Sequence, residues 1–398
     1  MATMGAKKKK KKKTKKDAYK KIFVLFSRVI KKLSPLQDQS VLFASDMREG
    51  MSGNMQFVHD NLPEGFKSYS FFTRTKWKPG NLLSFLRLTY LMTVCKYIIL
   101  EDFFTPTEFM KVRKGQQICQ LWHGGGFKRF AYGRKKKGEK LKLHSGYKKY
   151  AKVIVSSNAL RSVYAESFGV PLENVEATGI PKTDLFFDDE WISSAKEKFY
   201  AAYPELKNKK IVLLAPTYRG RTLDVATYDF SRIDFEELKK VLGPDYAIIT
   251  RWHPAVYNSF KAGTAAAPDL TPYDGFAVDI PGSFTVEELM TVSDVLLTDY
   301  STVMFDYSLT GKPMIFYAYD LDEYDGARGL YFDYEEYSYG EIITEKAKLP
   351  EAIKNAHTDP ERLRKFRTKF MDACDGHASE KTANYFFRDE RPSAADQA

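Results

Sequence analysis

Residues 295–307, VLLTDYSTVMFDY, and residues 311–317, GKPMIFY, have the pattern of a strand, a tight turn, a short helix and a second strand. The apolar run at the start suits a buried strand, the polar residues after it can cap a helix, and Gly311 is suited to end that helix. A helix whose first turn carries Ser301 and Thr302 directs N–H groups and hydroxyls beyond the strand end, which favours phosphate. The stretch therefore predicts an α/β unit that handles phosphate.

Strand-like and helix-like stretches alternate over most of the chain, which predicts the α/β class with parallel sheets of βα units. The other strand-like runs are residues 41–44, 97–100, 118–122, 153–155, 211–215 and 246–250. The series starts afresh near residue 208, and 398 residues suffice for two domains. We therefore expect domains at residues 37–200 and 201–385, followed by a flexible tail at residues 386–398.

The positive charge is concentrated at the amino terminus. The chain has 62 Lys and Arg against 51 Asp and Glu, a net charge of +11, and residues 1–21 alone hold eleven lysines and one aspartate. We predict that residues 1–17 form a disordered polylysine tail and that residues 18–36 contain a basic amphipathic helix. The apolar positions of this helix are Ile22, Phe23, Leu25, Phe26, Val29, Ile30 and Leu33.

Such a helix can lie in the plane of an anionic membrane, where each nearby basic residue adds about 1 kcal/mol of attraction. The alternative is a helix that packs on the protein body behind a solvated tail. No stretch of the sequence reaches the roughly 18 apolar residues of a membrane span. The body shows no interleaved basic and aromatic patch, so a nucleic-acid partner is not expected.

Polar side chains follow several of the predicted strands. His123, Arg219 and His253 each come just after an apolar run, as do Ser301 and Thr302. Because the carboxyl ends of parallel strands meet at one edge of a sheet, we expect these side chains to converge.

Each of these residues has a functional and a structural interpretation. His123 opens the stretch HGGGFK, residues 123–128, in which glycines let the backbone approach a ligand closely. Imidazole titrates near neutral pH, so His123 is a candidate general base, and His253 is a candidate general acid or hydrogen-bond donor to phosphate. Arg219 can clamp a phosphate with its planar fork. The alternatives are satisfied structural histidines and a surface arginine in a turn.

The sequence contains no motif for a metal or cofactor. There is no P-loop, no GxSxG turn and no HExxH helix. Asp320, Asp322 and Glu323 lie close together without a recognisable ligand spacing, which favours a solvated acidic turn. We therefore expect no metal and no cofactor.

Taken together, the motifs resemble the CDP-glycerol glycerophosphotransferase family, the teichoic acid glycerol- and ribitol-phosphate primases and polymerases of Gram-positive bacteria. The matching pieces occur in an unbroken order over about residues 40–375. They are WHG (122–124), TGIPKTD (178–184), APTYR (215–219), HP (253–254), LTDYST (297–302), FDY (305–307), KP (312–313), FYAYD (316–320) and RG (328–329).

The resemblance implies a GT-B fold, in which two Rossmann-like domains face each other across a cleft. Residues 37–200 would bind the acceptor and residues 201–385 the CDP-linked donor. The implied reaction transfers glycerol phosphate from CDP-glycerol to a hydroxyl of a lipid-linked teichoic-acid-type or capsular polymer and releases CMP. The implied location is the cytoplasmic face of the bacterial cell membrane, with residues 1–33 on the anionic surface.

The resemblance also implies roles for the residues at the strand ends. His123 would deprotonate the acceptor hydroxyl. The donor diphosphate and the charge on the leaving CMP would be held by Arg219, His253, Ser301 and Thr302. Further contacts to donor or acceptor are expected from Gly124, Lys128, Thr217, Asp299 and Arg328.

Three alternatives stay open at this point. Close relatives transfer ribitol phosphate, so CDP-ribitol is a second candidate donor. Residues 125–128 read GGFK where the family often has Thr-Pro-Leu-Lys, which leaves the acceptor undefined. A GT-B glycosyltransferase that uses a nucleotide sugar would share the diphosphate site but add a sugar-binding carboxylate pair. A non-enzymatic basic membrane adaptor would use the amino-terminal segment alone.

Overall fold

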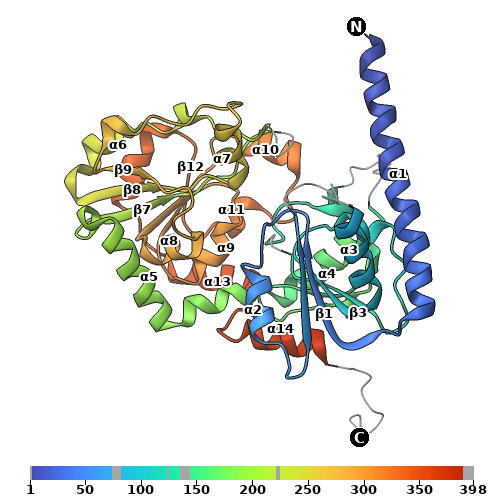
Figure 1. Ribbon diagram of the computed structural model, residues 1–398. Coiled ribbons are helices and arrows are strands. Elements are labelled where there is room, and N and C mark those ends of the chain that lie inside the picture. Colours follow the sequence, from blue (N-terminus) through green and yellow to red (C-terminus); the bar gives the residue numbers. More distant parts are fainter. Residues whose placement is uncertain (1, 74–81, 123–124, 135–143, 221–224, 389–398) are drawn as a thin grey trace, which may run out of the picture. The chain divides into compact units, whose positions relative to one another are not determined.

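The computed structural model describes residues 2–73, 82–122, 125–134, 144–220 and 225–388, with side chains from residue 18 onward except at residue 328 (Figure 1). These residues form two compact units, each with its own sheet. Unit 1 takes in the described chain up to residue 122, residues 130–182 and residues from 377 onward, and unit 2 takes in residues 125–129 and 183–376.

Unit 1 contains a sheet whose six strands, among the described residues, run in the order β2-β1-β3-β4-β5-β6, with every neighbouring pair parallel. The strands are β1 (Gln37–Ser45), β2 (Lys67–Phe72), β3 (Cys95–Leu100), β4 (Gln117–Gln120), β5 (Tyr150–Ile154) and β6 (Val175–Glu176). The helices are α1 (Ala2–Leu33), α2 (Asn54–Asp60), α3 (Leu82–Val94), α4 (Arg161–Phe168) and α14 (Ala378–Phe387).

Unit 2 contains a second parallel sheet, with the described strands in the order β12-β11-β10-β7-β8-β9. The strands are β7 (Lys210–Leu214), β8 (Tyr246–Thr250), β9 (Ala277–Asp279), β10 (Val295–Thr298), β11 (Met314–Tyr317) and β12 (Glu341–Ile343). The helices are α5 (Asp189–Ala202), α6 (Phe235–Leu242), α7 (Pro254–Lys261), α8 (Val286–Val292), α9 (Val303–Ser308), α10 (Leu321–Arg328), α11 (Tyr334–Tyr337), α12 (Leu349–Lys354) and α13 (Pro360–Phe370). This strand order is that of the Rossmann fold, and the two parallel sheets confirm the predicted α/β class.

Buried strands form the centre of each unit. Every residue of β3 in unit 1 is buried, as is every residue of β8 and β10 in unit 2. Strands of this kind are mostly apolar because helices cover both faces of a parallel sheet. Burial of each large aliphatic side chain contributes about 1.5–3 kcal/mol relative to exposure, so these runs determine where the sheets form.

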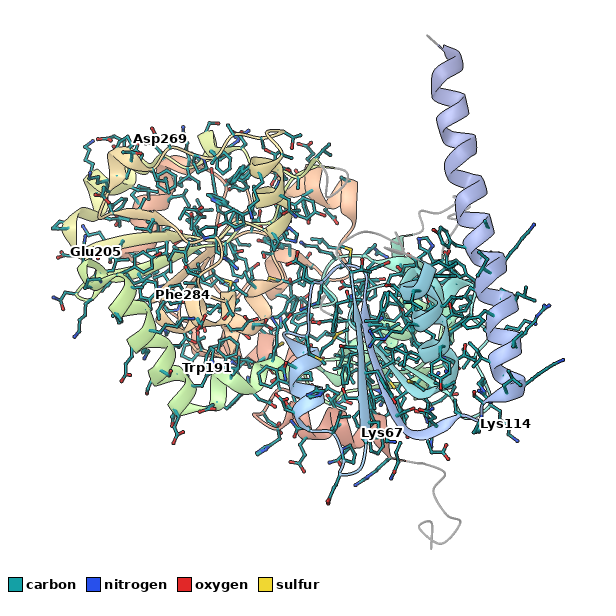
Figure 2. All side chains as sticks on the ribbon, viewed as in Figure 1. Lys67, Lys114, Trp191, Glu205, Asp269 and Phe284 are labelled. Atoms are coloured by element: carbon teal, nitrogen blue, oxygen red, sulfur yellow. The ribbon has the colours of Figure 1, made fainter. Side chains whose placement is uncertain are left out.

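The boundary between the units differs from the predicted one at residue 200. Helix α5 belongs to unit 2, because Phe199 lies 5.6 Å from Phe284, which is labelled in Figure 2, and Lys198 pairs with Glu288 at 2.7 Å. The aromatic packing buries the apolar face of α5 against the start of α8. The division therefore falls near residue 183, at the amino-terminal side of α5.

The carboxyl-terminal helix α14 returns to unit 1, whereas the sequence predicts that residues up to 385 belong to the second domain and that a tail begins at 386. Phe387 lies 5.2 Å from the ring of Tyr97, and Phe386 is fully buried. Lys152 of β5 donates to the carbonyl of Phe386 at 3.2 Å, which neutralises the negative end of the helix. The rest of the predicted tail, residues 389–398, lies outside the described residues.

Helix α1 spans Ala2–Leu33, so the backbone of residues 2–17 is helical where the sequence predicts disorder. Lysine is a good helix former, and no proline interrupts the run. One face of α1 packs on unit 1, with Phe23 5.9 Å from Phe109 and 6.3 Å from Phe85 of α3. A second face exposes Ile22, Leu25, Val29 and Leu33, at 37%, 66%, 45% and 78%. Across the described chain, no helix combines the length and the apolar character that crossing a bilayer requires.

Candidate active site

The strand order of unit 2 changes direction between β7 and β10. The chain runs from β7 through β8 to β9 on one side, then returns to β10 on the other side and continues to β11 and β12. Loops that leave the two central strands in opposite directions open a crevice at their carboxyl ends, where α/β proteins bind ligands. The predicted residues at this edge are Thr217 and Arg219 after β7, His253 after β8, and Asp299, Ser301 and Thr302 after β10.

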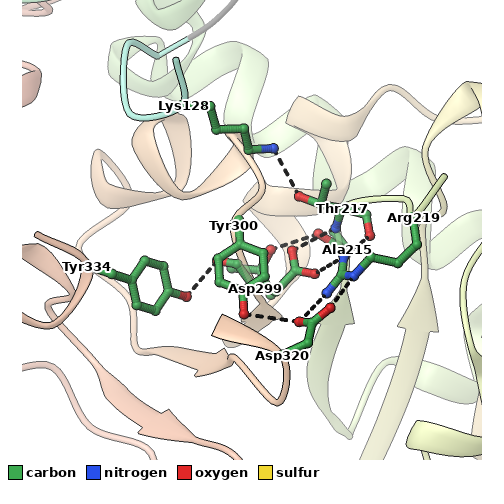
Figure 3. A network of polar contacts seen from close by, with 9 residues as sticks. Lys128, Ala215, Thr217, Arg219, Asp299, Tyr300, Asp320 and Tyr334 are labelled. Atoms are coloured by element: carbon green, nitrogen blue, oxygen red, sulfur yellow. Dashed lines mark hydrogen bonds and ion pairs between the residues drawn. The ribbon is translucent and has the colours of Figure 1, made fainter. Parts of the chain in front are cut away.

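The carboxylate of Asp299 links the two central loops. Asp299 is 1% exposed, and its Oδ1 accepts a hydrogen bond from the Thr217 N–H at 2.7 Å. Its Oδ2 accepts from Arg219 at 2.9 Å, and its backbone carbonyl accepts from the Tyr334 hydroxyl at 2.9 Å (Figure 3). A buried carboxylate is tolerated only when its oxygens are paired, so these bonds hold the loops after β7 and β10 together.

The guanidinium of Arg219 is held by two carboxylates. Its Nε and Nη2 donate to the two oxygens of Asp320 at 2.7 and 2.9 Å, and its Nη1 donates to Asp299 and to the Thr217 carbonyl. These four bonds use four of the five N–H groups that an arginine carries. Although burial alone lowers it, the two carboxylates raise the pKa of Arg219 above its ordinary value. The planar fork of Arg219 thus binds Asp320, and the phosphate-clamp role stays a prediction.

Tyrosine rings enclose the same ion pairs. Four rings have their centroids 5.3–6.0 Å from the guanidinium carbon of Arg219, and they belong to Tyr228, Tyr300, Tyr319 and Tyr324. The Tyr300 hydroxyl donates to Asp320 at 3.1 Å, and its ring stacks on Tyr324 at 4.0 Å. Burial and the charge of Asp320 raise the pKa of Tyr300, so this hydroxyl remains protonated at neutral pH.

Sequence reasoning missed three members of this network. Asp320 was expected in a solvated acidic turn, yet its carboxylate binds Arg219, 101 residues away in sequence. Tyr300 and Tyr334 carry no sequence signal for their hydrogen bonds to Asp320 and to the Asp299 carbonyl. The one usable signal was the position of Asp320 shortly after a predicted strand, the feature that also marked Arg219 and His253.

Lys128 also lies in this network. Its Nζ donates to the Thr217 hydroxyl at 3.2 Å and lies 5.6 Å from the ring centroid of Tyr324 (Figure 3). The neighbouring Phe127 is 2% exposed and anchors residues 125–129 in unit 2. Its ring contacts those of Phe305, Phe332, Tyr334 and Phe370. The structure thus places Lys128 beside Thr217 at the carboxyl end of β7.

His253 precedes the first turn of α7. Its Nδ1 accepts a hydrogen bond from the Ala255 N–H at 3.1 Å, and its ring lies 4.7 Å from that of Tyr218. With Nδ1 as an acceptor, the proton of the neutral imidazole is on Nε2. This tautomer suits His253 to donate a hydrogen bond through Nε2 at the carboxyl end of β8.

Ser301 and Thr302 precede α9, and both are partly exposed. Their carbonyls accept from Met304 and Phe305 at 3.3 and 3.2 Å, while neither hydroxyl bonds to another residue that the structure describes. The expected side-chain cap on this helix is absent, because the carboxylate of Asp299 binds Thr217 and Arg219 instead.

The other predicted site residues are only partly described. His123 and Gly124 lie outside the described residues. Before them, Trp122 of unit 1 has a φ of 32°, which strains a bulky residue. The Trp122 N–H donates to the buried side-chain oxygen of Gln120 at 3.0 Å, and its ring stacks on Phe130. Such strain is typical of functional segments and requires support from the surrounding structure.

The remaining predictions concern the acidic residues and α10. Asp322 and Glu323 are exposed in the first turn of α10, and the described side chains contain no cluster suited to a metal ion. Arg328 ends α10, and its side chain is outside the described atoms.

Comparison with known proteins places these features in a family. A family model described as CDP-Glycerol:Poly(glycerophosphate) glycerophosphotransferase matches residues 25–388. The teichoic acid poly(ribitol-phosphate) polymerase of Bacillus spizizenii is 37% identical over 375 residues, which are 92% of this chain and 59% of that protein. The teichoic acid ribitol-phosphate primase of the same species is 31% identical over 380 residues, with 92% and 95% covered.

A solved structure shows the same fold. The wall teichoic acid polymerase TagF aligns with a TM-score of 0.73 at 22% identity over 94% of each chain. This likeness extends to both α/β units. The present chain spans about three fifths of the length of the Bacillus spizizenii polymerase.

We predict that Gly125→Ala destabilises unit 2. A Cβ at this position would lie 2.1 Å from the ring of Phe305, which is itself 2% exposed. Overpacking of this kind costs about 1–3 kcal/mol, so thermal unfolding followed by circular dichroism should show a lower melting temperature. Gly282→Ala is the control, because a Cβ there meets no atom within 4 Å. Equal melting temperatures for the two variants would contradict the close packing of this loop.

Proposed function

This chain belongs to the CDP-glycerol:poly(glycerophosphate) glycerophosphotransferase family, and on that premise we propose that it transfers an alditol phosphate from a CDP-alditol to an acceptor hydroxyl, with release of CMP. The match over residues 25–388 is the observation that carries the proposal. The acceptor proposed is a teichoic-acid-type polymer or its lipid-linked primer.

Two alditols are candidates for the donor. The family description names CDP-glycerol, whereas the two Bacillus spizizenii relatives are named for ribitol phosphate. The identity of 37% to the polymerase favours CDP-ribitol as the first donor to assay, with CDP-glycerol beside it. A nucleotide-sugar glycosyltransferase has less support, because the carboxylates of Asp299 and Asp320 are engaged by Arg219 rather than presented to a sugar.

In the proposed mechanism His123 removes the proton from the acceptor hydroxyl. The resulting oxygen attacks the phosphorus that carries the alditol, and the bond from that phosphorus to the bridging oxygen of the diphosphate breaks. CMP leaves with the electron pair of that bond, so no redox partner is needed. Catalysis then depends on positioning and on stabilisation of phosphate charge.

The donor half of the site is proposed at the carboxyl ends of β7, β8 and β10. The Nε2–H of His253 and the hydroxyls of Ser301 and Thr302 are the proposed donors to the diphosphate. Lys128, beside Thr217, supplies a positive charge at the same edge. The proposal extends to the family arrangement in which the two units face each other across a cleft.

Helix α1 is the proposed membrane contact. The face with Phe23 is buried on the rest of unit 1, which leaves Ile22, Leu25, Val29 and Leu33 exposed. The lysines at positions 20, 21 and 32 are exposed as well. These four positions recur at helical spacing, and an exposed apolar stripe among basic residues is suited to an anionic bilayer surface. Attachment at the cytoplasmic face of the membrane would bring the enzyme to a lipid-linked acceptor.

The test of function is a nucleotide-release assay. The protein is incubated with CDP-ribitol, CDP-glycerol or UDP-sugars and a lipid-linked acceptor, and we expect CMP release with at least one CDP-alditol. His123→Ala should lower turnover by about 10²–10⁴-fold without weakening the binding of CDP. His357→Ala, at an exposed position of unit 2, serves as the control.

Two results would contradict parts of this proposal. Release of UDP without CMP would exclude an alditol phosphotransferase and favour a glycosyltransferase. High residual turnover of His123→Ala, combined with weaker CDP binding, would remove His123 from the general-base role and make it a donor ligand.

We predict that Leu25→Glu with Leu33→Glu weakens binding to vesicles that contain phosphatidylglycerol by at least tenfold in co-sedimentation. The expected loss exceeds about 1.4 kcal/mol, because two exposed leucines no longer enter the bilayer interface. Leu172→Glu, which is 49% exposed elsewhere in unit 1, controls for the added charge. Unchanged binding of the double variant would show that this face of α1 does not contact lipid.

A further inference from the structure

Arg219 is a cation at the switch point of unit 2, yet two carboxylates already surround it. The side chains of Asp299 and Asp320 both pair with it, at 2.9 and 2.7 Å, so the three groups together carry a net charge of −1. An anionic diphosphate is repelled by a group of this net charge and gains attraction only from other cations.

The bonds of Arg219 reach loops from three neighbouring strands. Arg219 itself follows β7, Asp299 follows β10, and Asp320 precedes α10 after β11. Two of these loops also carry groups proposed to contact the donor, the Thr217 segment after β7 and the hydroxyl pair after β10. The spacing between those groups therefore depends on the ion pairs that fix the loops.

We propose that Arg219 is a positioning residue that fixes the three loops of the donor site, and that it is not a ligand of the donor phosphates. The proposal rests on the proposed function, because it concerns the edge of unit 2 at which the CDP-alditol is expected. It assigns phosphate contact to His253, Ser301, Thr302 and Lys128, and it makes Asp320 and Asp299 part of the framework of the site.

The competing arrangement is a latch, in which Asp320 releases the fork of Arg219 when a diphosphate arrives. That exchange would break the two charge-assisted bonds between Arg219 and Asp320. It would also leave the carboxylate of Asp320 beside the incoming phosphates, with like charges at close range. The fourfold bonding of Arg219 and the enclosing tyrosine rings favour a fixed guanidinium.

The two arrangements predict opposite effects of Asp320→Asn on the binding of CDP, measured by titration calorimetry. A positioning role predicts that CDP binds about 5–20-fold more weakly, although a negative charge has been removed from the site, because the loops lose their anchor. A latch predicts tighter binding, because the fork of Arg219 is released. Asp322→Asn is the matched control, since it removes the same charge from an exposed position on α10.

Steady-state kinetics provides a second readout that a general loss of stability would not move. With Asp320→Asn, the KM for the CDP-alditol should rise by about the same factor as the Kd for CDP. The KM for the acceptor should stay within twofold of the wild-type value. Tighter binding of CDP, or equal changes in both KM values, would overturn the proposal.

Tyr300→Phe decides the case if Asp320→Asn does not fold. This change removes only the hydroxyl that donates to Asp320 at 3.1 Å and keeps the ring that packs on Tyr324. We expect CDP to bind about 2–3-fold more weakly, whereas a latch that has been loosened would bind CDP more tightly. Absence of CDP binding by the wild-type protein would overturn the proposed function, and with it this proposal.

Discussion

The buried carboxylate of Asp299 is the constraint on which the donor side of the site depends. It lies where the sheet of unit 2 changes direction, and it can be buried there only because Thr217 and Arg219 donate to it. Arg219 in turn binds a second carboxylate, that of Asp320 in the loop after β11. One desolvated charge thus determines the arrangement of three loops, and those loops carry the groups proposed to hold the diphosphate.

The reactive part of the proposed mechanism lies in the short segment after β4. Trp122 is held in unit 1 by Gln120 and by aromatic packing, and Phe127 is held in the core of unit 2. In the sequence, His123 therefore lies between Trp122 and Phe127, whose side chains are both packed in place.

The strands of both sheets could be located from the sequence, whereas only some members of the polar network around Arg219 could be predicted. Apolar runs such as residues 246–250 coincide with a buried strand, because continuous burial requires continuous apolar character. The return of α14 to unit 1 depends on contacts between Phe387 and Tyr97, which no local pattern reveals. The pairing of Arg219 with Asp320 was missed for the same reason, since charges distant in sequence give no periodic signal. The phosphate clamp at Arg219 stays a prediction, because an arginine after a strand suits an internal carboxylate as well as a phosphate.

A double-mutant cycle on Asp299 and Arg219 tests the central claim most directly. The free energies of unfolding of Asp299→Ala, Arg219→Ala and the double variant would be measured by urea denaturation against the wild type. Arg219→Ala removes the ion-pair partner of the buried Asp299, so this change should cost about 3–5 kcal/mol. Asp299→Ala should cost less, because Arg219 keeps its bonds to Asp320. The loss of unfolding free energy in the double variant should be smaller than the sum of the two single losses by about 2 kcal/mol or more. Additive effects within about 0.5 kcal/mol would show that the pair does not hold the loops together.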